Sequence, residues 1–199
     1  MRKKTVALLI TLGLSFCLLG CGGTIGEIGG TTPGSAAEYN SLGWESFEKG
    51  SYSNAEKNFS KALQVNHSQA EYANAYTGLG WTKAKVNGIR AGISYFEKAK
   101  NYNHDARVGL GGAFLSSTNK TDYENGVFLL EQVGLSSLDY VYKSAHDIGV
   151  TNAEAHAILG ILYYYTGNEG AGLAQIQKAK ELDDNISSAV DSIADEFIQ

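Results

Sequence analysis

An internal repetition after residue 35 is the feature that most constrains how this chain of 199 residues can fold. Three segments, which start at Leu42, Leu79 and Leu159, each begin with a Leu-Gly pair. At 8, 13, 17 and 20 residues after the Leu, they place a turn residue, a small residue, a large apolar residue and an alanine. A weaker fourth copy starts at Ala113. Such regularity is typical of repeat proteins, in which each short unit buries its apolar face against its neighbours.

This template resembles the tetratricopeptide repeat, a helix–turn–helix unit of about 34 residues with a Leu-Gly pair in its first helix and alanine and aromatic residues in its second. The resemblance implies an all-α fold, a helix–turn–helix repeat solenoid of about four repeats. The expected repeats cover residues 36–69, 73–106, 107–140 and 153–186, and an amphipathic C-terminal helix over 186–199 is expected to cap the stack. Residues 141–152 interrupt the pattern as an insertion, and the closing proline of the family is absent.

Small residues at equivalent positions predict where helices approach each other closely. Gly43, Gly80 and Gly160 are expected to face the second helix of their own repeats, where a branched side chain has no room. Phe59 and Phe96, at the large apolar position of the template, are expected to lie in the buried stripe.

The N-terminus has the layout of a secretory signal. Three basic residues at positions 2–4 precede an apolar run over 6–19, which is too short to span a membrane comfortably. The run ends in Leu-Leu-Gly-Cys, which resembles the bacterial lipobox. The resemblance implies a signal peptide over residues 1–20 and lipid modification of Cys21. The alternative is an ordinary signal peptide with an incidental cysteine.

A lipidated Cys21 would hold the domain at a membrane, because each buried methylene contributes about 0.8 kcal/mol. Residues 21–35, rich in glycine, read as a flexible tether to the helical domain over 36–199. Gly22 follows the cysteine, where some two-membrane bacteria use aspartate for retention in the inner membrane. The expected location is therefore the cell envelope: the outer membrane, on its periplasmic face, in a two-membrane bacterium, and otherwise the external face of the cell membrane.

Charge and motif content argue against several functions. The chain carries 16 Lys and Arg against 21 Asp and Glu, and a net charge of −5 gives no basic surface for nucleic acid. The pairs His104-Asp105 and His146-Asp147 superficially resemble metal ligands, but no established ligand spacing supports a metal site. The pair of His146 and His156 is the one worth examining. No catalytic motif is present, so we expect a protein that is not an enzyme and has no cofactor.

Aromatic residues on the first helices indicate a binding function. In the tetratricopeptide family the corresponding positions face a concave groove that binds protein segments, and here they hold Trp44, Phe47, Trp81, Tyr164 and Tyr165. Large aromatic side chains are the usual anchors of interfaces. The alternative is that these rings pack against the next repeat or the terminal helix.

The function that this resemblance implies is a membrane-anchored binding or scaffolding module for a protein or peptide partner. The alternative function is a small-ligand or peptidoglycan-binding envelope lipoprotein that uses its tyrosines.

Overall fold

The computed structural model describes residues 34–186, which form an all-α fold. The predicted signal peptide, Cys21, nearly all of the tether, and the capping helix beyond Ile186 lie outside the described residues. Within them the helices are α1 (Ala36–Glu48), α2 (Tyr52–Ala62), α3 (Gln69–Asn87), the 3₁₀ helix η1 (Ile89–Gly92), α4 (Ile93–Ala99), α5 (His104–Phe114), α6 (Lys120–Val133), α7 (Asn152–Thr166), α8 (Glu169–Leu182) and the 3₁₀ helix η2 (Asp184–Ile186).

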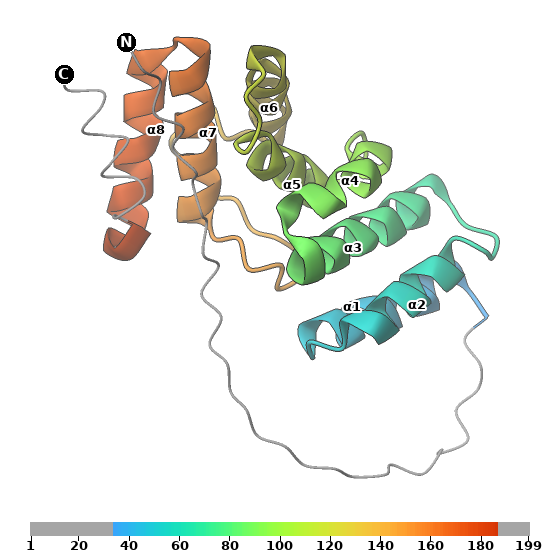
Figure 1. The fold of residues 1–199 in the computed structure, drawn as a ribbon. Helices are drawn as coiled ribbons and strands as arrows, with labels where there is room; N and C mark the ends of the chain where they lie inside the picture. The colour runs from blue at the N-terminus through green and yellow to red at the C-terminus, as the bar shows by residue number, and fades with distance from the viewer. Residues whose placement is uncertain (1–33, 187–199) are drawn as a thin grey trace.

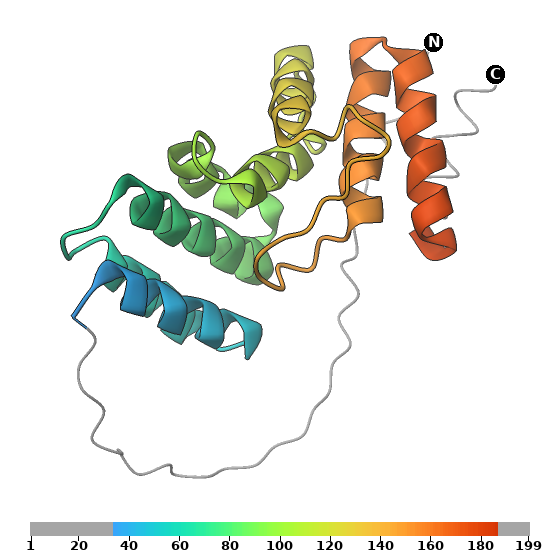
Figure 2. The same ribbon diagram turned by 180° about the vertical axis from the view of Figure 1, so that it is seen from behind.

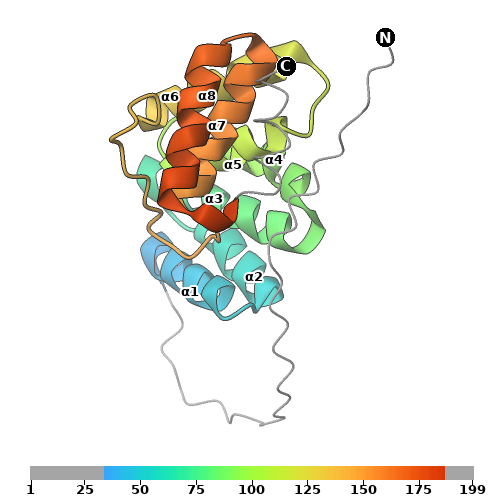
Figure 3. The same ribbon diagram turned by 90° about the vertical axis from the view of Figure 1, so that its left-hand side faces the viewer.

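The eight α-helices of the described residues form four antiparallel pairs stacked in chain order. Each helix packs on the next one in the sequence, and the first helices of successive pairs also touch: α1 contacts α3, α3 contacts α5, and α5 contacts α7. The pair of α1 and α2 lies at one end of the stack and the pair of α7 and α8 at the other (Figures 1 and 3). The prediction of an all-α fold is confirmed.

Capping residues fix where several of these helices begin. Ser68 and Glu71 form a capping box, in which each side chain accepts a hydrogen bond from the backbone N–H of the other residue, so α3 begins at Gln69 rather than at the predicted repeat start of 73. Asn103 caps α5 in a similar way, through its side-chain oxygen and the N–H of Ala106, and α5 begins three residues before the predicted start of 107.

Glycines on the first helices hold the aromatic rings of the second helices. A Cβ atom built on Gly43 of α1 would lie 2.5 Å from the ring of Phe59, and one built on Gly78 of α3 would lie 2.2 Å from the same ring. Phe96 of α4 is held in the same manner, between Gly80 of α3 (2.4 Å) and Gly109 of α5 (2.7 Å). Each phenylalanine therefore packs between the first helix of its own pair and the first helix of the next pair.

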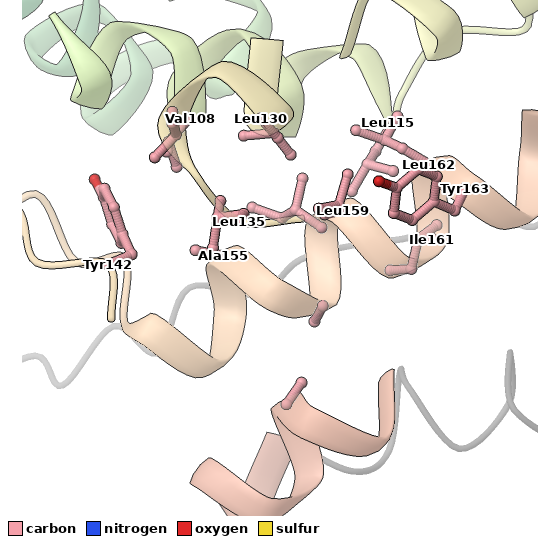
Figure 4. Close-up of a cluster of buried hydrophobic side chains, with 14 of the residues drawn as sticks. Val108, Leu115, Leu130, Leu135, Tyr142, Ala155, Leu159, Ile161, Leu162 and Tyr163 are labelled. Atoms are coloured by element: carbon pink, nitrogen blue, oxygen red, sulfur yellow. The ribbon is translucent and has the colours of Figure 1, made fainter. Parts of the chain in front are cut away.

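The prediction that the glycines of the Leu-Gly pairs face their own second helix is confirmed. In the last pair, a Cβ on Gly160 would lie 2.9 Å from Ile176 of α8. Figure 4 shows the buried cluster of this half of the molecule, in which side chains of α5, α6 and α7 meet.

The insertion between α6 and α7 contains no helix, and it runs along the stack. It leaves the end of α6, reaches the C-terminal ends of α1 and α3, and then returns to the start of α7 (Figure 2). We call residues 140–150 the strap. Two glycines in this insertion have positive φ: Gly134 (φ 109°), before the strap, and Gly149 (φ 74°), near its end. Such φ values favour glycine over every other residue.

Candidate binding surface

The predicted groove residues do not form one open surface. Trp44, Phe47 and Trp81 are each only 3% exposed, so the prediction that their rings line an open groove is wrong. Tyr164 is half-buried and Tyr165 is 39% exposed, and both lie on α7 in the last helix pair. The structure therefore separates the three N-terminal residues from the two tyrosines.

The two tryptophans are buried because each reaches across to the following first helix. The indole Nε1 of Trp44 donates to Asn74 Oδ1 of α3 at 2.8 Å, and that of Trp81 donates to the backbone oxygen of Asp105 in α5 at 3.2 Å. Their rings also pack edge-on against the second-helix phenylalanines of their own pairs. A buried indole needs such a partner for its N–H group, and here the partner comes from the neighbouring pair.

The strap covers this region as a non-helical segment that bends at residues 145 and 146 and whose side chains alternate in burial. Tyr142, Ser144, His146 and Ile148 are buried or half-buried, whereas the residues between them, together with Val141, are exposed. This alternation places every second side chain of the strap against the helices. The inward side chains meet a surface that we call the inner face, formed by Trp44 and Glu48 of α1, Trp81 of α3 and Asp105 of α5.

Asp105 holds the first half of the strap. Its carboxylate accepts a hydrogen bond from the hydroxyl of Tyr142 at Oδ1 and another from the hydroxyl of Ser144 at Oδ2, both at 2.7 Å. The residue is only 7% exposed and lies in the first turn of α5, where the helix dipole favours a negative charge. Burial and the adjacent Asp105 carboxylate raise the pKa of Tyr142 far above its ordinary value, so the phenol stays a donor.

Trp44 holds the second half of the strap. The imidazole of His146 stacks on the indole with ring centroids 3.9 Å apart and planes 9° from parallel, and its Nδ1 lies 3.5 Å from Glu48 Oε1. Ile148 is fully buried in the apolar cluster that includes Trp44 and Trp81. The sequence predicted neither Asp105 nor Ile148 as part of a site, although the spacing of Tyr142, Ser144, His146 and Ile148 was a visible signal.

The pKa of His146 lies below its ordinary value of 6.5, because burial disfavours the imidazolium and the charges of Glu48 and Asp105 offset this effect only in part. The unfolded chain then binds more protons than the folded chain as the pH falls below 6.5. Above pH 6.5, neutral His146 therefore makes its full contribution to the free energy of unfolding. This contribution is lost as the pH falls toward the lower pKa of His146 in the folded state.

We expect the free energy of unfolding to fall more between about pH 7.5 and pH 5.5 in the unmodified chain than in His146→Phe, which keeps a ring on Trp44 but cannot take up a proton. Urea unfolding at the two pH values measures both differences, and the remaining histidines cancel in the comparison. An equal pH dependence in the two proteins would contradict this account.

The histidines do not assemble a metal site in the described part of the chain. His156 is fully buried on α7, where Nδ1 lies 2.6 Å from Gln175 Oε1 and Nε2 lies 3.0 Å from the backbone oxygen of Tyr140, so it contacts α8 and the start of the strap and not His146. Over residues 34–186 no group of three or more His, Cys, Asp or Glu side chains could hold a metal ion. No helix over the same residues is long and apolar enough to cross a membrane.

Comparisons with protein-family models and with curated proteins find no match to this chain.

Proposed function

We propose that this chain is a membrane-anchored, non-enzymatic binding or scaffolding module of the bacterial cell envelope, which binds a segment of a partner protein on its inner face. The observation that carries this proposal is the strap itself. The inner face holds this non-helical segment through alternate side chains, which hydrogen-bond to Asp105, stack on Trp44 and enter the apolar cluster beside Trp44 and Trp81. The surface therefore has the chemistry needed to bind such a segment from another protein.

A tetratricopeptide-like solenoid is the architecture that we propose for the stack. Two features support it: the contacts between successive first helices, and the sharing of Phe59 and Phe96 between neighbouring pairs. In such an array the first helices line one continuous face, which brings Trp44, Trp81 and Asp105 from three different pairs onto one surface.

The anchor is the second part of the proposal and rests on the Leu-Leu-Gly-Cys sequence. We expect Cys21→Ser to abolish acylation and to release the protein from the membrane fraction, because the thiol is the attachment point of the lipid. Membrane fractionation, with mass spectrometry of the N-terminal peptide, measures this. A melting temperature equal to that of the unmodified chain controls for folding. A Cys21→Ser variant that is still lipidated and bound to the membrane would contradict the proposal.

The alternative function, binding of a small ligand or of peptidoglycan, has one observation in its favour. Tyr165 stacks on Tyr123 of α6 with ring centroids 4.8 Å apart and planes 20° from parallel, and Tyr164 meets Tyr165 edge-on. Stacked rings at a partly exposed position are suited to packing against the face of a sugar ring.

Site-specific photocrosslinking in the native membrane tests the binding function. A photoreactive residue at Glu48, an exposed position of the inner face on α1, is expected to form an adduct with a protein, whereas the same residue at the exposed position Lys57 of α2 is expected to form none. Adducts with glycan from Tyr165, and none with protein from Glu48, would favour the alternative function. Equal protein adducts from Glu48 and Lys57 would contradict a specific inner face.

A further inference from the structure

The inward side chains of the strap make its contacts with α1, α3 and α5, and within residues 34–186 its backbone bonds to the helices only through side chains of α7, at Asn152 and His156. Among the described residues, the backbone–backbone hydrogen bonds include none between residues 141–149 and a helix; the bond from the N–H of Ile148 to the carbonyl of His146 lies within the strap. The N–H of Tyr142 donates to a side chain, Asn152 Oδ1. A segment held in this manner can leave the surface without breaking any helix.

We propose that the strap is a resident, competing occupant of the inner face, and that a partner binds by displacing it. This inference rests on the proposed function and adds its regulation. The strap places two hydroxyl donors on Asp105, a planar ring on Trp44 and an aliphatic side chain in the cluster beside Trp44 and Trp81, at every second residue. A displacing segment must supply the same groups at the same spacing.

The charge of the inner face narrows the class of partner further. The charged groups that meet the inward side chains of the strap from the helices are the carboxylates of Asp105 and Glu48. An acidic segment would place like charges against them, whereas hydroxyl groups and an imidazole donate hydrogen bonds to them. The partner segment is therefore neutral or basic, and it bears a hydroxyl, a hydroxyl, a planar ring and an aliphatic side chain at alternate positions.

Tethering makes the strap an effective competitor. Because the strap is joined to the chain that carries its site, it acts at an effective concentration on the order of 1 mM. A free partner segment of equal intrinsic affinity therefore binds only the molecules in which the strap is undocked. Binding therefore increases when the docked state is destabilised. Of the two glycines with positive φ, Gly134 precedes the segment that must move and Gly149 lies near its end.

The test uses the full chain and a labelled synthetic peptide with the sequence of residues 140–150. A strap variant carries Tyr142→Gly, Ser144→Gly, His146→Gly and Ile148→Gly, which remove all four inward side chains. Fluorescence anisotropy is expected to show peptide binding to the strap variant that is at least about 10-fold tighter than binding to the unmodified chain. A control peptide of the same composition, in which each inward residue is exchanged with its outward neighbour, presents the wrong face and is expected not to bind.

Two outcomes would overturn the proposal: a folded strap variant that gains no affinity, or equal binding of the two peptides. If the strap variant does not fold, the milder double variant Ser144→Gly/His146→Gly replaces it, and hydrogen exchange on the unmodified chain provides an independent measurement. Exchange of the amides of 141–149 while α7 stays protected supports displacement, and exchange of both only on global unfolding contradicts it.

These results are distinct from those of the crosslinking experiment. Partner adducts without a gain of peptide affinity would leave the binding function standing and identify the strap as a fixed part of the core. A gain of peptide affinity without any partner adduct would show a displaceable strap and contradict the proposed function.

Discussion

Trp81→Ala is expected to lower the free energy of unfolding by about 3–5 kcal/mol, the usual cost of removing a large buried aromatic side chain. The ring is 3% exposed and packs against Phe96, with ring centroids 5.2 Å apart, and the indole N–H bonds to the backbone of α5. The substitution leaves a cavity between two helix pairs and removes the donor that pairs with the Asp105 carbonyl. Urea unfolding followed by circular dichroism measures the loss.

Tyr102→Ala is the matched control for this prediction, because the Tyr102 side chain is 62% exposed and its removal is expected to change stability by less than about 0.5 kcal/mol. The open-groove hypothesis drawn from the sequence predicts the reverse for Trp81, with binding lost and stability kept. An unchanged free energy of unfolding in Trp81→Ala would therefore contradict the buried position and favour the open groove.

Gly80→Leu is expected to destabilise the fold by about 3 kcal/mol or more, at the upper end of the range for overpacking. Its Cβ would lie 2.4 Å from the ring of Phe96, and that ring is confined from the other sides by Gly92 and Gly109, so it cannot move away. Thermal and urea unfolding measure the effect.

Gly170→Leu is the control, since a Cβ at Gly170 in α8 meets no other atom within 4 Å. Leucine has the higher helix propensity, so this change is expected to be neutral or stabilising by up to about 1 kcal/mol. Similar destabilisation by the two substitutions would show that the loss comes from replacing a helical glycine in general and not from the close approach to Phe96.

The sequence predicted the helix pairs well because the signals for them are local and repeated. The Leu-Gly pairs place Gly43, Gly80 and Gly160 against their second helices, as expected. The contact of Gly78 with Phe59 was not predicted, although Gly78 precedes Gly80 by two residues; Gly109 stands in the same relation to Gly111, which faces Leu130 of its own pair. Gly78 and Gly109 both face the second helix of the preceding pair, whereas the repeat template relates only positions within one repeat.

The repeat pattern left two positions for the tryptophan rings, an open groove or packing against the next repeat, and the structure shows the second for Trp44 and Trp81. The pattern could not predict the additional cover, which comes from an insertion distant in the sequence. The contact between His146 and Trp44 joins this insertion to the first helix, and no local pattern encodes such a pairing. Tyr164 and Tyr165, at the C-terminal end of α7, retain partial exposure.

The strap also changes how the molecule is expected to unfold. A stack of helix pairs that touch only their neighbours behaves as a one-dimensional array, which can fray from either end one unit at a time. The contacts of the strap with α1 and α5 connect the first pair of this array to the segment that leads into the last pair. While the strap is docked, loss of the first pair also removes these contacts, so the stability of the first pair is coupled to the docking of the strap and not to its neighbouring pair alone.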